Sequence, residues 1–192
     1  MNTNIIKESS RGFDMIHPED HLLEERKIFF TEEVTSESAK QLIQLLLYLE
    51  QDNPKKEICL YINSPGGEVI SGLAVYDTLI GLKCPVRTVC IGTAASMGSI
   101  LFLAGKKRQI LKHAEVMIHD PLVGGLKGAQ NALALDKEAK KLMKTRETLG
   151  QILADRTGHS LEEVFDKTKE DCYLDAEEAL EFGIATEIVS RA

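Results

Sequence analysis

The sequence contains no tryptophan, and aromatic residues make up only 5% of its 192 positions. A core must therefore be built mainly from aliphatic side chains. Long apolar runs are also absent, since the longest candidate, "SMGSILFLAG", stops well short of the roughly 20 residues that cross a bilayer. The N-terminal residues lack the basic-then-apolar pattern of a secretion signal. We therefore expect a cytoplasmic protein that does not contact membranes.

Cysteine is also scarce. The four cysteines are scattered without CxxC spacing, so we expect no zinc site and no other metal. No GxxxxGK[ST] loop is present, so we expect no ATP site on this chain. The formal net charge of −7 gives no basic footprint for nucleic acid. The sequence therefore predicts no cofactor and no nucleic-acid partner.

What is present is an alternation of helical and strand patterns. A helical period through "SESAKQLIQLLLYLEQ", with Ser36 as N-cap, is followed by a buried strand at 57–62. A second helix follows "NSPGG", a second strand lies in "CPVRTVCIG", and shorter strands are expected at 108–111 and 115–118. This order predicts an α/β fold with a largely parallel sheet.

The chain divides unevenly. Residues 1–21 are polar and interrupted by Gly12 and Pro18, so we expect a flexible arm, with order beginning near Leu22 and a single domain over 22–192. A charged helix with a thin apolar stripe is expected over 129–157, far longer than the average of about a dozen residues. A helix this long and polar stands in solvent or meets a partner chain.

The sequence marks two helix starts near its C-terminus. Ser160 with Glu163, and Asp175 with Glu178, have the spacing of capping boxes. Gly183 suits the position just after a helix end. These signals predict two short helices before a last strand in "IATEIV".

Ser96 lies in "GTAASMGS", where an apolar strand meets a short helix. The pattern "A-A-S-M-G" resembles a nucleophile elbow with alanine in place of the first glycine. Small residues two positions before and after the serine permit a sharp turn. A serine at a helix start is more commonly an N-cap, so the motif alone leaves both roles open. Ser99, one turn later, is expected to pack or to bond the backbone.

A serine nucleophile needs a base, and His119 is the best placed of the five histidines. It ends the apolar run "VMI", although a hydrogen-bonded histidine at a strand end is the alternative. The orienting acid is less clear: Asp120 is adjacent, and neighbours rarely point at each other, while Asp136 and Asp155 fall on the long helix. Asp171 precedes "CYL" in a loop that can return to the sheet, which the sequence does not prove.

Two turns carry candidate oxyanion donors. "SPGG" ends with Gly66 and Gly67 after one strand, and Met97 follows Ser96 after another. In a parallel sheet both turns emerge at the same edge, so their N–H groups can converge. The alternative is that the two glycines only make a tight turn.

The motifs "LYINSPGGEVISGLAVYDTL", "GTAASMGSILFLAG", "VMIHDPLVGG" and "YLDAEEALEFGIATEIV" closely resemble the ClpP family, the proteolytic subunits of ATP-dependent Clp protease. The resemblance runs in register from about Leu22 to Val189. It implies a crotonase-like αββ-spiral fold and a triad of Ser96 as nucleophile, His119 as base and Asp171 as orienting acid. It also implies that Gly67 and Met97 supply the oxyanion amides.

The resemblance implies more about substrate and assembly. Substrate would bind as an added β-strand along two segments. The residues concerned are Gly66, Glu68, Val69, Gly125 and Leu126. The long helix would be a handle joining two seven-membered rings. The particle would degrade unfolded polypeptides delivered by a hexameric AAA+ ATPase such as ClpX or ClpC.

The sequence also departs from the family pattern. Two positions that are usually aromatic in the ATPase-docking pocket are Cys59 and Gly81, although Tyr61 remains, and lost aromatic area weakens an anchoring pocket. An acidic–arginine pair thought to couple ring contact to activity is replaced by Lys169 and Glu170. The signs are swapped but complementary. We therefore expect a divergent or second ClpP that assembles with itself or with a sister subunit.

Three functions are consistent with these features. The first is an active serine endopeptidase, which explains why all three of Ser96, His119 and Asp171 are present. The second is a weakly active or inactive ring-forming scaffold for a sister subunit, which the altered pocket and coupling pair favour. The third is an acyl-CoA hydratase of the same fold superfamily, which needs no Ser–His pair and usually has a longer chain.

Overall fold

Five of the seven strands that the described residues contribute to the main sheet pair in parallel, in the order β3-β4-β5-β6-β9. The computed structural model describes residues 5–9, 12–122 and 131–191. The five strands are β3 (Lys27–Phe30), β4 (Ile58–Ser64), β5 (Val86–Ala95), β6 (Lys107–Leu111) and β9 (Glu187–Val189). Their parallel pairing confirms the α/β class expected from the sequence.

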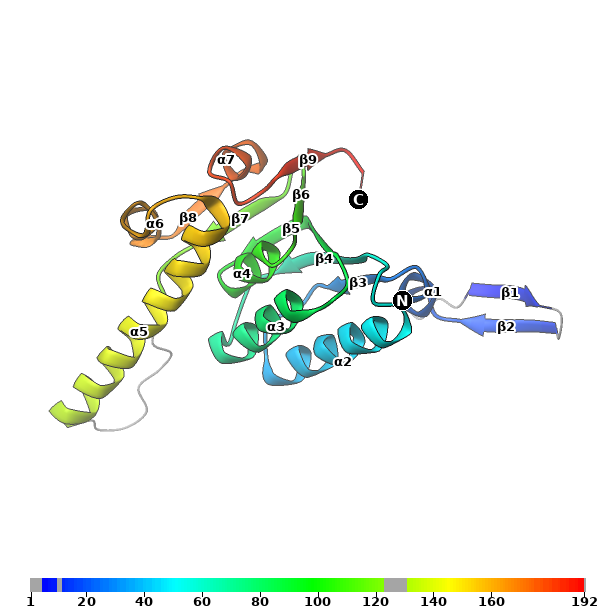
Figure 1. Cartoon of the computed structure of the whole chain (residues 1–192), viewed down its shortest axis with the longest axis horizontal. Helices are drawn as coiled ribbons and strands as arrows, with labels where there is room; N and C mark the ends of the chain where they lie inside the picture. Colours follow the sequence, from blue (N-terminus) through cyan, green and yellow to red (C-terminus); the bar gives the residue numbers. More distant parts are fainter. Residues whose placement is uncertain (1–4, 10–11, 123–130, 192) are drawn as a thin grey trace.

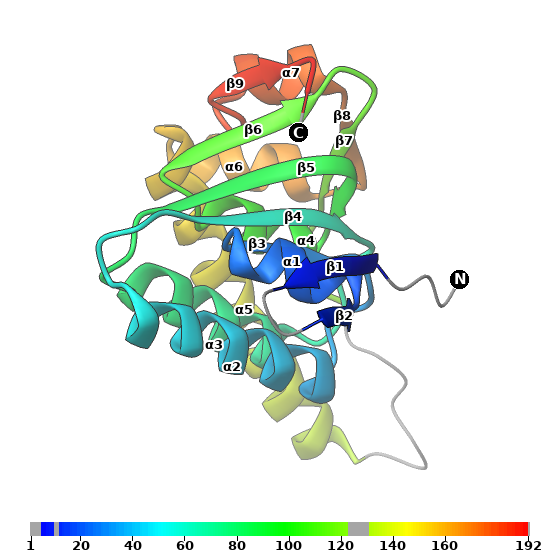
Figure 2. The same ribbon diagram turned by 90° about the vertical axis from the view of Figure 1, so that its right-hand side faces the viewer.

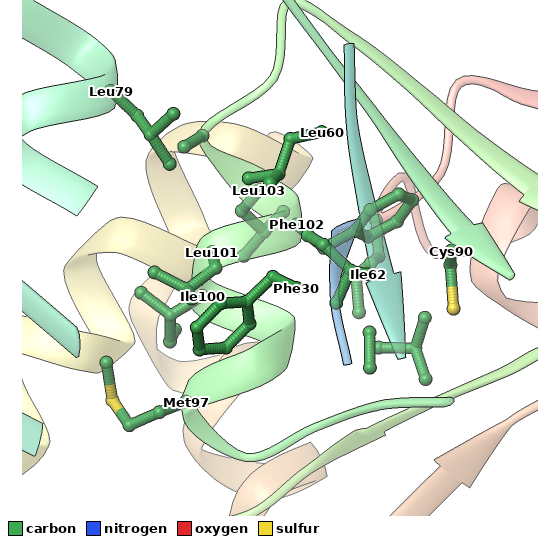
Figure 3. Packing of buried hydrophobic residues seen from close by; sticks show 14 of the residues in the cluster. Phe30, Leu60, Ile62, Leu79, Cys90, Met97, Ile100, Leu101, Phe102 and Leu103 are labelled. Carbon is green, nitrogen blue, oxygen red and sulfur yellow. The ribbon is translucent and has the colours of Figure 1, made fainter. Parts of the chain in front are cut away.

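Helices cover one face of this sheet (Figure 2). They are α2 (Ser36–Asp52), α3 (Val69–Gly81) and α4 (Met97–Leu103). Successive side chains of β4 point to opposite faces of the sheet. Leu60 belongs to the aliphatic core beneath the helices, whereas Cys59 and Tyr61 form a small separate cluster with Val89. Every residue of α4 is buried, and its side chains fill the core between sheet and helices (Figure 3).

Strand β5 is long enough to pair with two different strands, one after the other, along the same edge. Its first half pairs with β6 over Arg87–Cys90, and its last residues, Thr93–Ala95, pair with β7 (Glu115–Ile118). Strand β8 (Cys172–Leu174) then adds to β7 in the antiparallel sense. Helices α6 (Leu161–Thr168) and α7 (Ala176–Glu181) flank β8 in sequence.

Helix α5 (Ala132–Thr157) projects away from the rest of the chain (Figure 1). Its base is anchored by buried Leu149 and Leu153, whereas Leu133 near its start is 82% exposed. The sequence placed this helix at 129–157; it begins at Ala132, and residues 129–130 lie outside the described part of the chain. From the sequence we expected this helix either to lie in solvent or to contact a partner chain, and within one chain its first half lies in solvent.

The N-terminal segment has more secondary structure than its polar composition predicted. A hairpin of β1 (Ile5–Ser9) and β2 (Gly12–Ile16) projects on the side opposite α5 (Figure 1), and α1 (Pro18–Glu24) begins before Leu22. Secondary structure therefore begins before Leu22, where the sequence predicted that order begins. Pro18 begins the helix because its fixed φ suits the first turn, and the hairpin rests on backbone pairing, which composition does not reveal.

The helix caps are nearly as expected. Thr35, not Ser36, caps α2, because its side chain accepts a hydrogen bond from the Ser38 amide. The capping boxes that begin at Ser160 and Asp175 are both confirmed. Gly183 follows α7 with φ of 78°, the left-handed conformation that glycine adopts readily. Within the described ranges, no helix has the length and apolar character needed to cross a membrane.

A substitution in β4 tests the assignment of its inner face. Leu60 is fully buried, so Leu60→Ala should lower the free energy of unfolding by about 2–5 kcal/mol through lost burial and a cavity. Leu47→Ala is the control, because Leu47 on α2 is 49% exposed and should cost less than about 0.5 kcal/mol. Urea unfolding followed by circular dichroism measures both, and equal losses would contradict the burial pattern.

Candidate active site

Strand register brings three polar residues to one edge of the sheet. Ser96 follows the last residue of β5, which pairs in parallel with β7, and His119 follows the last residue of β7. Asp171 precedes β8, whose first residue Cys172 pairs with Ile118 in the antiparallel sense. The ends of three neighbouring strands therefore meet at this point.

Ser96 occupies a strained turn between β5 and α4. Its φ of 53° and ψ of −120° are unusual for a residue with a side chain, and such strain persists only where the surroundings enforce it. Its backbone N–H donates to the Met117 carbonyl at 2.8 Å, which holds the turn against β7. Its side chain makes no capping hydrogen bond with α4. Ser96 therefore occupies the N-cap position of α4, but its hydroxyl does not cap the helix.

The Ser96 hydroxyl instead contacts His119. The distance from Ser96 Oγ to His119 Nε2 is 2.9 Å. The other ring nitrogen, Nδ1, lies 3.3 Å from Asp171 Oδ1. Because a carboxylate only accepts, Nδ1 carries the proton and Nε2 is free to accept one from the serine. The serine hydroxyl, the imidazole and the carboxylate therefore form one chain of contacts.

The two glycines of "SPGG" lie directly beside Ser96. A Cβ on Gly66 would come within 2.8 Å of the Met97 nitrogen and 2.6 Å of the Ala95 carbonyl oxygen. The Gly66 carbonyl and the Glu68 N–H are both bonded to Val34, each at 2.7 Å, in a parallel bridge centred on Gly67. In such a bridge the N–H of the central residue points away from the partner.

The Gly67 N–H therefore faces away from Val34, and Met97, as the first residue of α4, has an amide without an intrahelical acceptor. The positive φ values of the glycines, 91° for Gly66 and 144° for Gly67, are what permit this approach. Gly67 and Met97 line the same pocket as Ser96.

A pocket of about 220 Å³ opens next to Ser96 and His119. Most of its wall is apolar, and its lining includes Val69, Ile100, Ile118, Leu122, Leu149 and Leu153. A second hollow of about 380 Å³, between the start of α3 and the middle of α5, shares Val69 and Leu122 and includes Glu68. An apolar side chain next to a bond held at Ser96 would fit the first pocket.

Of the residues expected to hold substrate, Gly66, Glu68 and Val69 border this region. Glu68 is the N-cap of α3, and its carboxylate accepts a hydrogen bond from Ser71 at 2.8 Å. Gly125 and Leu126 lie outside the residues that the structure describes.

The three residues expected in a docking pocket do not meet within one chain. Cys59 and Tyr61 lie together on the face of β4 away from the helices, and Phe29 stacks on Tyr61 with ring centroids 4.5 Å apart. Gly81 is the last residue of α3, in the helical layer on the other face. A pocket uniting them would need a neighbouring subunit.

Lys169 and Glu170 lie between the end of α6 and Asp171. The Lys169 ammonium donates to Asp166, on the same helix, at 2.6 Å. This ion pair raises the pKa of Lys169 and lowers that of Asp166, although both side chains are exposed. Within one chain the lysine is therefore engaged by α6 rather than by Glu170.

Sequence reasoning missed the role of Asp120. Its carboxylate accepts hydrogen bonds from Arg146 on α5 and from Thr168 at the end of α6. Neighbouring residues rarely point at each other, and the bonding partners of the Asp120 carboxylate are distant in sequence. Only the polar "HDP" before the glycine-rich loop hinted at it.

The buried thiols do not compete with Ser96 as nucleophiles. Burial raises the pKa of the Cys90 thiol to about 12, so almost none is thiolate at neutral pH. Burial also raises the pKa of the Cys59 thiol. Across the described residues, no three His, Cys, Asp or Glu side chains gather as metal ligands would.

The family model for Clp protease matches residues 10–192. The match spans nearly the whole chain, so this chain belongs to the Clp protease family. It is a ClpP-type peptidase by family, and the mixed sheet with its helices is the fold of that family. Members of this family form oligomers that work with Clp ATPases.

A methyl group on Gly66 tests how closely the glycine turn must approach Ser96. The added methyl group of Gly66→Ala would clash with the backbone of Ala95 and Met97 and push the two segments apart. Alanine would also be strained at a φ of 91°. We expect the rate at which a fluorophosphonate labels Ser96 to fall by about a hundredfold, as when an oxyanion donor is lost.

Gly158→Ala is the matched control. It strains a similar φ of 85°, but its added methyl meets nothing within 4 Å. It should lower thermal stability slightly without slowing the labelling. Equal labelling rates for Gly66→Ala and the unmodified protein would show that the close approach is unimportant.

Proposed function

We propose that this chain is a serine endopeptidase subunit that cleaves unfolded polypeptides through an acyl-enzyme. The observation that carries the proposal is the 2.9 Å contact between Ser96 Oγ and His119 Nε2 at a strained strand–helix turn. A serine that only capped α4 would turn its hydroxyl to the helix amides, which Ser96 does not. Membership of a peptidase family supports the same reaction class.

In the first step, Ser96 Oγ attacks the carbonyl carbon of a peptide bond while His119 Nε2 takes the hydroxyl proton. The carbonyl oxygen becomes an oxyanion, and the N–H groups of Gly67 and Met97 are the proposed donors to it. Asp171 accepts from Nδ1–H, holds the imidazole in its tautomer and stabilises the imidazolium that forms.

In the second step, the tetrahedral intermediate collapses. The C–N bond breaks, His119 gives its proton to the leaving amine, and an ester joins the substrate acyl group to Ser96. Water then enters, His119 takes one of its protons, and the resulting attack releases the carboxylic acid and restores the serine hydroxyl. The side chains of this chain supply every proton transfer.

Substrate selection follows from the walls of the site. The segment at 66–69 already makes a strand-like bridge with Val34, and an extended substrate would bond through its backbone to such an edge. Backbone bonding is independent of side-chain identity, which suits varied unfolded chains. The apolar pocket of about 220 Å³ favours an aliphatic or aromatic side chain beside the cleaved bond.

Assembly into two stacked seven-membered rings, fed by a hexameric AAA+ ATPase, is the corresponding proposal for its partners. The exposed apolar residues along the projecting half of α5 support a protein contact there. They are Leu133, Leu135 and Met143. The docking pocket of this chain has Cys59 at a position that is usually aromatic in the family. We therefore propose that its ATPase partner depends less on contacts with aromatic side chains than is common in the family.

Replacement of the nucleophile tests the reaction. A fluorophosphonate probe should label Ser96 in the purified protein, and mass spectrometry of the labelled peptide should place the adduct on that residue. Ser96→Ala should abolish labelling, and His119→Ala should slow it by at least about a thousandfold because the base is lost. Ser99→Ala, whose hydroxyl donates only to the Ser96 carbonyl, is the control and should still label.

Absence of labelling in the unmodified protein would instead favour a scaffold subunit, which the departures at Cys59 and at Lys169 allow. Labelling that appears only after a sister subunit or ATPase is added would mean that the triad aligns on assembly. Labelling that never appears would contradict the endopeptidase proposal.

Native mass spectrometry tests the assembly. We expect masses of seven or fourteen copies of the 21.3 kDa chain, because the apolar residues exposed on α5 are otherwise left in water. Charge placed on this surface, as in Leu133→Glu, should weaken the contact and shift the distribution to smaller species. Stable monomers alone, under conditions where Ser96 is labelled, would count against the ring proposal.

A further inference from the structure

Asp120, the residue after His119, is held by two separate helices. Its Oδ2 accepts a hydrogen bond from Arg146 Nε at 2.6 Å, and its Oδ1 accepts one from Thr168 Oγ1 at 2.8 Å. Its backbone N–H also donates to the Thr168 carbonyl at 2.7 Å. Asp120 thus connects the end of β7 to α5 by one hydrogen bond and to the end of α6 by two.

Arg146 is itself fixed in place. Its guanidinium carbon lies 3.6 Å from the centre of the Phe165 ring on α6. The two helices approach closely there, since a Cβ on Gly150 would come within 2.5 Å of that ring. The guanidinium therefore lies over Phe165 with its Nε directed at Asp120, and its side chain is only 23% exposed.

The bonds between Asp120 and Thr168 lie close in sequence to both members of the His119–Asp171 contact. Asp120 is one residue from His119, and Thr168 is three residues before Asp171. The Asp171 side chain is 61% exposed, so burial does not hold it, and its 3.3 Å contact with Nδ1 depends on where the backbone presents it. Fixing Asp120 to Thr168 fixes the distance between the two backbone segments.

We propose that Arg146, acting through Asp120, is a positioning residue for the His119–Asp171 pair. This inference rests on the proposed function, because it concerns the alignment of that triad. Arg146 touches neither His119 nor Asp171. It holds the Asp120 carboxylate in the geometry that also binds Thr168, and without it the loop 169–171 shifts relative to His119.

The competing explanation is that the Arg146–Asp120 pair only stabilises the packing of α5 against α6. It predicts that removing the pair changes thermal stability and leaves chemistry at Ser96 intact. A positioning role predicts that labelling slows by more than the loss of stability explains. Because the two side chains are only 23% and 30% exposed, a modest loss of stability is expected on either explanation. A displacement of about 1 Å in the base, in contrast, can slow a reaction a hundredfold.

The test is a double-mutant cycle on the rate of fluorophosphonate labelling at Ser96. Arg146→Ala and Asp120→Ala should each slow labelling by at least about tenfold, and the double variant should be no slower than the slower single one, because the two act as a unit. Arg146→Lys keeps a charge and a donor and should recover part of the rate. Melting temperatures should stay within a few degrees of the unmodified protein.

Asp136→Asn is the matched control. It removes an ion pair of similar length on the same helix, with Lys140 at 2.7 Å, that is distant from the triad. Its labelling rate should equal that of the unmodified protein. Single variants that label within twofold of the unmodified protein, or rates that multiply in the double variant, would overturn the inference.

Hydrogen exchange provides a readout that does not need an active enzyme. Arg146→Ala should speed deuterium uptake in peptides covering 168–174 and 118–122, while Asp136→Asn should not. Unchanged uptake there would overturn the inference even if the unmodified protein proved unreactive. A failure to label the unmodified protein even with a sister subunit or an ATPase present, with uptake changed as expected, would contradict the proposed function while the positioning of the loop stands.

Discussion

Strand β7 is the constraint on which the site depends, because its two edges are paired in opposite senses. On one edge it runs parallel to the end of β5, which places Ser96 and His119 at neighbouring strand ends. On the other it runs antiparallel to β8, which returns the chain so that Asp171 precedes the strand opposite Ile118. A shift of one residue in either register would turn the side chains to the other face of the sheet. The short four-residue strand thus sets the geometry of all three groups.

Much of the fold follows from local sequence signals. The buried strand around Leu60, the glycines after it and the capping boxes at Ser160 and Asp175 are each readable, because their causes lie within a few residues. The hairpin at 5–16 was not predicted, since its exposed side chains give no burial pattern. Strand β8 was not predicted, because three residues carry too little periodicity. Residue types and strand ends likewise pointed to Ser96 and His119.

The remainder of the site depends on contacts between distant segments. The sequence offered Asp171 as a candidate because of its loop, and the family resemblance implied its role. Its approach to His119 comes from the β7–β8 pairing. Asp120 was set aside as a triad member on geometric grounds, yet it binds residues 26 and 48 positions away. Such pairings leave no local pattern in a sequence. They also explain how an exposed aspartate stays close to His119: β8, which follows Asp171, pairs with β7, and the Asp120–Thr168 bonds hold the chain before it.

The account holds that Ser96, His119 and Asp171 form a working triad beside two backbone donors. A high-resolution experimental structure of the fluorophosphonate adduct tests this most directly. We predict phosphorus bonded to Ser96 Oγ and a phosphoryl oxygen within about 3 Å of the Gly67 and Met97 nitrogens. His119 should still lie between Ser96 and Asp171. An adduct whose phosphoryl oxygen points into solvent, or an imidazole turned away from Asp171, would contradict the account.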